Sequence, residues 1–178
     1  LKCWGRGQFG RLGTGTTATL GDAPEELGDN LPYVDIGTGL RVVSAGSGSY
    51  STCVITTAGT MKCFGFNSQG QLAYGTGGNR GDAPNQMGDF LGNVNLGTGL
   101  LAQFFTSGAS ARHFCALLNN GSSKCWGEGD YGKLGTGATL NIGDSGTEIG
   151  DLMPVLDVGS GRTLRSATAG SDFSCAVL

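Results

Sequence analysis

Charged side chains are scarce in this sequence, and the few that are present carry a small negative excess. Only 14% of the residues are Asp, Glu, Lys or Arg, and the formal net charge is −3. A protein that binds nucleic acid through its phosphates needs clustered lysine and arginine. The composition therefore argues against a nucleic-acid partner.

Several functional signatures are also missing. No apolar run approaches the roughly 20 residues of a transmembrane helix, and the opening LKCWG is not a signal peptide. The sequence has one histidine and contains no P-loop, dinucleotide-binding fingerprint or Ser-His-Asp set. We therefore expect no membrane span, no cofactor and no catalytic activity. If the protein is secreted, we expect its leader to be removed or to lie outside this sequence.

Glycine, in contrast, is abundant, with 35 of 178 residues. Such a chain is either disordered or built of tight turns, and a hydrophobic content of 38% favours the folded, turn-rich alternative. The segments RVVSAG, STCVITT, MKCFGF and YVDIG are short β-prone runs between glycine-rich turns. No window has a helical period. The sequence predicts an all-β protein.

Three copies of one sequence unit fill the chain. LKCWGRGQFGRLGTG recurs as MKCFGFNSQGQLAYG and SKCWGEGDYGKLGTG, and GDAPEELGDNLPYVDIGTG recurs as GDAPNQMGDFLGNVNLGTG and GDSGTEIGDLMPVLDVGSG. The repeat length is about 61 residues, which places the units at approximately 1–61, 62–123 and 124–178. We predict a single repeat domain over 1–178. Four short strands per unit are typical of a propeller blade or a β-solenoid coil.

Four of the six cysteines lie in two predicted hairpins. In CALLNNGSSKC, residues 119–121 form a three-residue loop with glycine in the left-handed position. Outward pairing then places Cys115 opposite Cys125 and, in the preceding unit, Cys53 opposite Cys63. Directly facing side chains have Cβ atoms about 4.5–5.5 Å apart, close to disulfide distance. The spacing favours cross-strand disulfides over reduced thiols, a zinc site or a Cys-x-x-Cys redox pair.

The stretch CALLNNGSSKCWGEGDYGKLGTG closely resembles the repeat of the regulator of chromosome condensation family, with its Cys-Ala-Leu, glycine turn, Trp-Gly pair and Gly-x-Leu-Gly. GDAPEELGDNLPYVDIGTG is similar to the long loop and fourth strand of secreted members. The resemblance covers all three units and implies a β-propeller of four-stranded antiparallel blades. Closed propellers typically have four to eight blades. Three blades therefore predict part of a larger propeller or an open repeat assembly.

The same hairpin is split between the two ends of the chain. LKC at the start and CAVL at the end correspond to its two strands, so Cys3 and Cys175 lack hairpin partners. Further repeats of a longer array, or Cys175 of one copy joined to Cys3 of the next, would supply them. A small ring closed on itself is the third alternative. An unpaired strand edge is a template for adding another unit.

His113 and Asn120 are the remaining single candidates. His113 aligns with Ser51 and Phe173 in the other units, and a catalytic role does not fit a position that accepts phenylalanine. We interpret it as structural. Asn120 begins the sequon Asn-Gly-Ser at the predicted hairpin tip, which makes it a glycosylation candidate. A good turn sequence explains the same residues without a glycan.

Two further patterns recur once or twice per unit. Trp4, Phe64 and Trp126 align at one position, where packing between blades is favoured over binding of sugars or peptides. Gly-Asp pairs are typical of turns, and a calcium site is the weaker alternative. The calcium candidates are Asp22, Asp29, Asp82, Asp89, Asp144 and Asp151.

These observations predict a non-catalytic extracellular repeat protein, with units joined end to end in a filament or longer array. Its expected partners are other copies or further repeats of the same chain. Disulfides form in oxidising compartments, which indicates a secreted, extracellular protein. The alternative is a secreted β-propeller that binds a protein or glycan ligand. No cofactor is expected in either case.

Overall fold

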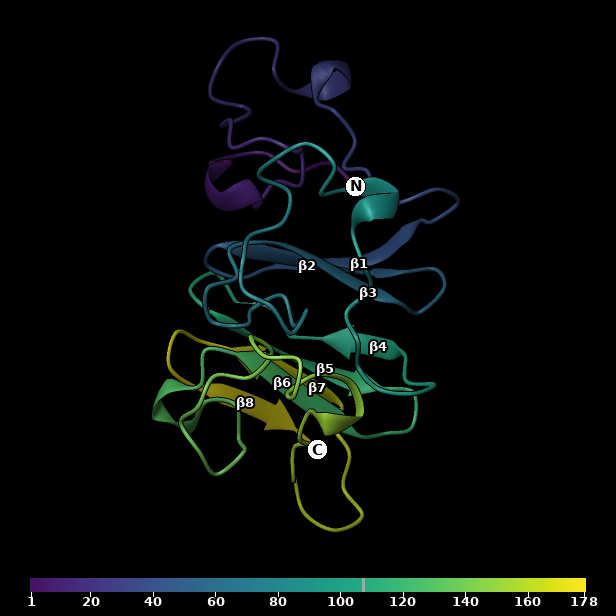
Figure 1. Ribbon diagram of the computed structural model, residues 1–178, viewed down its shortest axis with the longest axis vertical. Helices are drawn as coiled ribbons and strands as arrows, with labels where there is room; N and C mark the ends of the chain where they lie inside the picture. The colour runs from purple at the N-terminus through teal and green to yellow at the C-terminus, as the bar shows by residue number, and fades with distance from the viewer. Residues whose placement is uncertain (107) are drawn as a thin grey trace.

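Short antiparallel sheets follow one another along the long axis of the molecule (Figure 1). The computed structural model describes residues 1–106 and 108–178. The first sheet contains β1 (Val42–Ser47), β2 (Ser51–Thr56) and β3 (Met61–Gly65). The second contains β4 (Ala102–Phe105), β5 (His113–Leu118) and β6 (Ser123–Gly127), and the third contains β7 (Ser166–Ala169) and β8 (Ser174–Val177). The all-β prediction is confirmed.

The only helical elements in the described residues are short 3-10 turns in the connecting loops. They span Gln8–Gly10, Gly28–Asn30, Gly88–Phe90, Asp130–Gly132 and Gly150–Leu152. No helix in this part of the chain is long and apolar enough to cross a membrane.

Glycine sets the predicted hairpin turns. In the loop between β5 and β6, Gly121 has a φ of +83° and donates its N–H to the Leu118 carbonyl at 2.9 Å. The N–H of Leu118 donates to the Ser122 carbonyl at 2.9 Å, which closes the loop at the predicted residues. Glycine adopts this left-handed conformation without a Cβ clash. The resulting register places Cys115 opposite Cys125, as predicted.

The predicted fourth strand of each blade is present only as an extended segment. One backbone bond per repeat joins it to the neighbouring strand, from Val34 to Leu1, from Val94 to Met61 and from Leu156 to Ser123, at 3.0, 2.7 and 2.7 Å. Directly after each contact, the side chains of Asp35, Asn95 and Asp157 accept the N–H two residues further on. These local turns compete with a ladder. The first and second sheets therefore have three strands instead of four.

The sheets are offset from the sequence units. β3 begins at Met61, so the first sheet joins the end of the first unit to the start of the second, and the second sheet joins the second unit to the third. Residues 1–5 are the equivalent of β3 and β6 in the first repeat. They lie at one end of the molecule without counterparts of β1 and β2, or of β4 and β5, beside them. β7 and β8 lie at the other end without a following strand.

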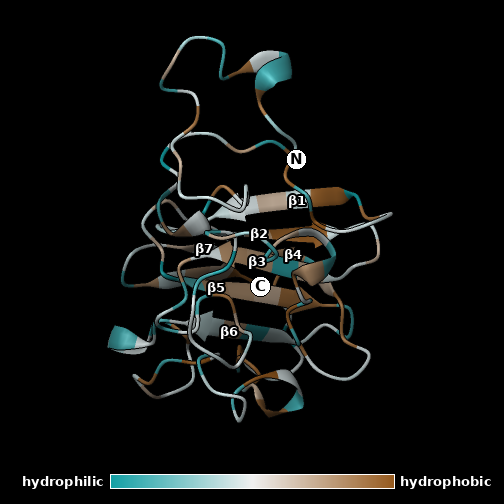
Figure 2. Ribbon diagram, turned by 45° about the horizontal axis from the view of Figure 1, so that its top comes forward, coloured by the Kyte–Doolittle hydropathy of each residue, from teal (hydrophilic) through white to brown (hydrophobic). Residues whose placement is uncertain are grey.

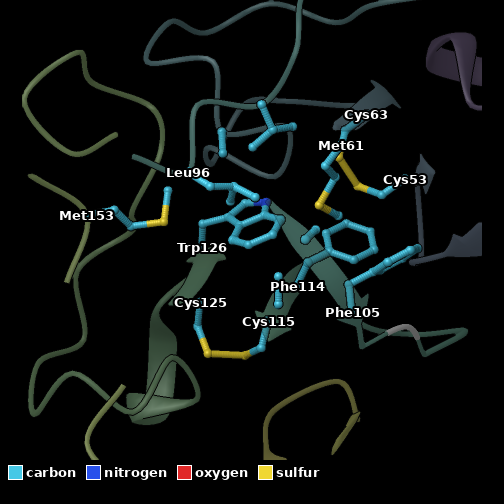
Figure 3. Close-up of a cluster of buried hydrophobic side chains, with 14 of the residues drawn as sticks. Cys53, Met61, Cys63, Leu96, Phe105, Phe114, Cys115, Cys125, Trp126 and Met153 are labelled. Carbon is cyan, nitrogen blue, oxygen red and sulfur yellow. A yellow bond between two sulfur atoms is a disulfide. The ribbon is translucent and has the colours of Figure 1, made fainter. Parts of the chain in front are cut away.

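Two apolar clusters pack against the first two sheets, and Figure 2 shows hydrophobic stretches along β1, β2 and β5. The larger cluster surrounds Trp126, which is 0% exposed and donates its indole N–H to the Gln71 carbonyl at 3.1 Å. Figure 3 shows Trp126 between Leu96 and Phe114, flanked by the two disulfides. The smaller cluster contains Phe64, also 0% exposed. The aromatic position therefore packs between repeats wherever a preceding repeat is present.

Candidate functional site: the junction between repeats

A polar junction joins neighbouring repeats, and it occurs twice with the same atoms. The Asp89 carboxylate accepts the backbone N–H of Thr38 at 2.7 Å and its hydroxyl at 2.8 Å. One repeat later, Asp151 accepts the N–H of Thr98 at 2.8 Å and its hydroxyl at 2.7 Å. These bonds hold the pKa of both carboxyl groups below their usual range. Each carboxylate thus ties its 3-10 turn to the glycine-rich turn of the preceding repeat.

Backbone and lysine contacts complete the junction. The N–H of Gly88 donates to the Asp35 carbonyl, and the N–H of Gly150 donates to that of Asn95, both at 3.0 Å. Behind the turns, the Lys62 ammonium donates to the Leu91 carbonyl at 2.7 Å, and Lys124 donates to the Gly150 and Leu96 carbonyls at 2.8 and 2.9 Å. Burial lowers the pKa of both lysines, and the nearby Asp89 and Asp151 oppose that shift.

Close backbone approach adds a third part to the junction. At Gly10, a Cβ atom would lie 2.3 Å from the Asp82 nitrogen of the next repeat. At the equivalent Gly70, it would lie 2.5 Å from the Ile142 carbonyl oxygen. Both glycines have a φ of +77°, which disfavours any side chain. At Gly132, the third copy, nothing lies within 4 Å of that position.

Each end of the chain carries one half of this junction. At the N-terminal end, the turn Gly28–Asn30 has the same 3-10 form, and Lys2 donates to the Gly28 carbonyl at 2.6 Å. Asp29 is exposed and has no hydrogen-bond partner among the described residues. At the C-terminal end, Asp157 forms the same turn as Asp35, which leaves Ser160 exposed at the position of Thr38 and Thr98.

The two predicted disulfides are present. Cys53 is bonded to Cys63 and Cys115 to Cys125, with Cα atoms 4.1 and 4.0 Å apart. Cys3 and Cys175 carry free thiols in the single chain. Burial raises the pKa of the Cys3 thiol. Because both cysteines are free in the single chain, an intermolecular Cys3–Cys175 bond stays a prediction.

The six acidic candidates do not gather into a metal site. Within residues 1–106 and 108–178, no three His, Cys, Asp or Glu side chains lie close enough to hold an ion. Asp89 and Asp151 bind threonines, and Asp82 accepts the side-chain amide of Asn79 at 3.0 Å. The calcium hypothesis has no site in this part of the chain.

His113 lies in a buried polar cluster at the start of β5. Its Nε2 lies 2.7 Å from the Ser174 hydroxyl, which itself donates to the Lys133 carbonyl at 2.9 Å. The Lys133 ammonium pairs with Glu128. The Nδ1 atom of His113 is buried without a partner among the described residues, so no third group orients the imidazole as a base would require. The contacts agree with a structural role.

The replacement His113→Phe should flatten the dependence of stability on pH between about 4 and 6.5. Burial, aided by Lys133, lowers the pKa of His113 from 6.5 to about 4. As the pH falls, the unfolded chain therefore takes up the proton before the folded chain does. The contribution of neutral His113 to the free energy of unfolding is complete above pH 6.5 and falls by about 3 kcal/mol as the pH drops to 4. Urea unfolding of both proteins across this range measures the difference. Parallel pH profiles would contradict the assignment.

Asn120 lies at the exposed tip of the loop between β5 and β6. Its side-chain oxygen accepts the N–H and the hydroxyl of Ser122, at 3.0 and 2.7 Å. The sequon thus occupies an accessible turn, and the turn interpretation accounts for its local bonds.

Comparisons with known proteins identify the repeat. The model of the regulator of chromosome condensation (RCC1) repeat matches residues 42–71 and 108–133. A bifunctional serine/threonine-protein kinase/NEDD4-like E3 ubiquitin-protein ligase of Dictyostelium discoideum is 30% identical over 90% of this chain and 8% of its own length. The ultraviolet-B receptor UVR8 of Arabidopsis thaliana is 29% identical over 75% of this chain and 26% of its own length. The chain thus spans a small part of the curated relatives that it matches.

Solved structures show the same fold. Human WBSCR16 superposes with a TM-score of 0.64 at 16% identity, over 94% of this chain and 37% of that protein. Yeast RCC1 (Prp20), solved with Kap60, gives 0.60 at 18% identity, over 98% of this chain and 36% of that protein. The sheets described above therefore correspond to blades of an RCC1-type β-propeller. Sequence match and fold agree, and the chain contains repeats of the regulator of chromosome condensation (RCC1) type.

Proposed function

We propose that this chain is a non-catalytic extracellular assembly module that joins end to end with other copies or further repeats, in a filament or longer array. The observation that carries the proposal is the repeated polar junction. It is complete at Thr38–Asp89 and Thr98–Asp151, and its two halves are left open at opposite ends, with Asp29 at one end and Ser160 at the other. Opposite ends with complementary halves are suited to head-to-tail joining.

The strand edges fit the same arrangement. β8 is exposed along its length and pairs on one side only, with β7. Extending the register of β2 and β3 to the ends places Cys175 opposite Cys3 and Ser174 opposite Trp4, where Cys53 faces Cys63 and Thr52 faces Phe64. The outer edge of β8 would then receive residues 1–5 of the next copy, as an unpaired edge strand tends to do.

The extracellular assignment is supported by the disulfides. Two bonds at hairpins with a separation of ten residues imply an oxidising compartment. The accessible sequon at Asn120 fits a secreted eukaryotic protein. Expression through a eukaryotic secretory pathway, followed by peptide N-glycosidase treatment, is expected to show a mass loss that Asn120→Gln abolishes. No mass loss would remove the glycan from the proposal.

The replacement Asp29→Ala should weaken self-association about 5- to 10-fold, because one charged acceptor of the proposed junction is lost. Light scattering against concentration measures the effect. The matched control is Glu25→Ala, which removes the same charge from an exposed position in the same loop. A mass of 18.0 kDa at every concentration would overturn the joining of separate copies.

A second candidate function, binding of a protein or glycan ligand, is favoured by one groove. Phe9, Tyr50 and Phe66 lie with ring centroids 4.8–6.0 Å apart, and the Arg11 and Arg112 guanidinium groups lie 4.8 and 5.4 Å from the Tyr50 ring. Aromatic and arginine side chains dominate binding hot spots. Saturable binding of a polyglutamate peptide by the monomer, lost in Arg112→Ala, would favour this function.

A further inference from the structure

A groove between the first and second repeats concentrates positive charge in a chain whose net charge is negative. It has a volume of about 340 Å³ and is lined by Arg6, Arg112 and the rings of Phe9, Tyr50 and Phe66. Two glutamines and a serine complete the lining, so no carboxylate faces the groove among the described residues. A pocket of this size, with rings and a few convergent polar groups, is typical of a small-molecule site.

The three rings form one cluster of tilted and edge-to-face contacts. The ring centroids of Phe9 and Tyr50 lie 5.8 Å apart with planes at 87°, and those of Phe9 and Phe66 lie 4.8 Å apart at 46°. Phe9 has a φ of +66°, a left-handed conformation that is unfavourable for a bulky side chain. All three side chains stay partly exposed, so the cluster offers an apolar surface to a further ring.

Three arginines lie in the groove or against its rings without a full set of partners. The Arg11 and Arg112 guanidinium groups lie 4.8 and 5.4 Å from the Tyr50 ring centroid. Burial and the positive charge of Arg6 lower the pKa of Arg11, because like charges repel. The Nη2 atom of Arg11 is buried without a hydrogen-bond partner, and the exposed Arg6 has none among the described residues. The cluster therefore lacks a counter-charge.

One repeat later, polar side chains occupy the positions of the three rings. The equivalent residues are Gln69, Arg112 and Glu128. The Glu128 carboxylate accepts the Gln69 side-chain amide at 2.8 Å and the Arg112 Nη1 at 3.4 Å, and it also pairs with Lys133. At that position the chain itself thus supplies the carboxylate for its cations. The groove between the first and second repeats has cations but no carboxylate of its own.

Arg112 belongs to both arrangements and is only partly used. Its side chain is 41% exposed, and it reaches Glu128 through Nη1 alone. Its Nε and Nη2 atoms have no hydrogen-bond partner within the part of the chain that the structure describes. A guanidinium group binds a carboxylate best through two parallel N–H bonds. Arg112 therefore has free donors for a second carboxylate, in the groove that Arg6 also lines.

We propose that this groove binds a small organic carboxylate whose body is an aromatic ring, with the carboxylate on Arg6 and Arg112 and the ring against Phe9 and Phe66. The inference rests on the second candidate function, ligand binding, and names its ligand class. It does not depend on end-to-end assembly. The rings fit the ligand's apolar body and the guanidinium groups its charge, so a neutral ring or a simple anion uses only part of the site.

Titration of nitrogen-15-labelled protein with phenylacetate, followed by NMR, tests the ligand class. We expect saturable shifts at the groove residues and binding at least about 10-fold tighter than that of acetate, which lacks the ring, or phenylacetamide, which lacks the charge. Inorganic phosphate should also bind at least about 10-fold more weakly than phenylacetate. Binding of phenylacetate that is no tighter than that of all three probes would overturn the inference.

The replacement Arg6→Gln should weaken phenylacetate binding at least about 5-fold, because it removes one charged donor from an exposed side chain. Phe9→Ala should weaken binding of phenylacetate and leave binding of acetate unchanged. The matched control is Arg41→Gln, at an exposed arginine that precedes β1, whereas Tyr50 follows that strand. It should change binding less than about 2-fold. Equal losses in Arg6→Gln and Arg41→Gln would contradict the site.

The polyglutamate titration separates the two levels of the account. If the monomer binds polyglutamate and Arg112→Ala abolishes that binding, while phenylacetate binds no tighter than acetate, the ligand class is wrong and the second candidate function stands. If neither polyglutamate nor phenylacetate shifts the resonances of the groove residues, both fail.

Discussion

Replacing Cys53, Cys63, Cys115 and Cys125 by alanine should lower the free energy of unfolding by about 5 kcal/mol. Each disulfide joins residues ten apart, and a loop of that length stabilises by about 2.5–3 kcal/mol through its effect on the unfolded chain. Urea unfolding measures the loss. Variants that lack one pair should each show about half of it, which keeps the measurement possible if the fourfold variant does not fold.

The control removes the two cysteines outside the disulfides. Cys3→Ala combined with Cys175→Ala should cost less than about 1 kcal/mol in the monomer, because neither residue is bonded within the chain. A reductant should reproduce the fourfold loss in the natural chain and have no effect on the fourfold variant. Equal stability of the natural and fourfold proteins would show that the hairpins are not bonded.

The replacement Trp126→Ala should destabilise the chain by about 4 kcal/mol. The indole is fully buried between the first and second sheets, and its removal leaves a large cavity and an unpaired Gln71 carbonyl (Figure 3). The same change at Trp4 should alter monomer stability by about 0.5 kcal/mol or less, since that side chain is mostly exposed. The comparison uses one residue type at one repeat position.

Trp126→Phe provides the intermediate case, with an expected loss of about 1–2 kcal/mol from the smaller ring. Thermal or urea unfolding at a concentration where the protein is monomeric measures all three variants. A loss at Trp4→Ala as large as that at Trp126→Ala would mean that Trp4 is already buried in the single chain.

The hairpins were predictable because their determinants are local. A three-residue loop that ends in glycine fixes which residues face each other, so the register of Cys115 and Cys125 follows from eleven consecutive positions. The fourth strand was not predictable from β propensity alone. Its side chains at Asp35, Asn95 and Asp157 bond to the backbone two residues later and turn the chain away from a ladder.

The junction between repeats escaped prediction because its partners are far apart in sequence. The recurring Gly-Asp pairs were visible, yet their turn partners Thr38 and Thr98 lie 51 and 53 residues before Asp89 and Asp151. The signal was available in the equally regular Gly-Thr-Gly and Gly-Ser-Gly motifs.

The central claim, that the two ends of neighbouring copies complete one blade, is tested most directly by cross-linking. Copies labelled with nitrogen-15 are mixed with unlabelled copies and oxidised with glutathione disulfide. The Cys175 and Cys3 thiols give up two electrons and two protons, which convert the oxidant to two glutathione thiols. Peptide mapping without reductant should find Cys3 joined to Cys175 across the labels, with Cys53–Cys63 and Cys115–Cys125 intact. Cys3 and Cys175 joined only within one copy, or left unjoined, would contradict the account.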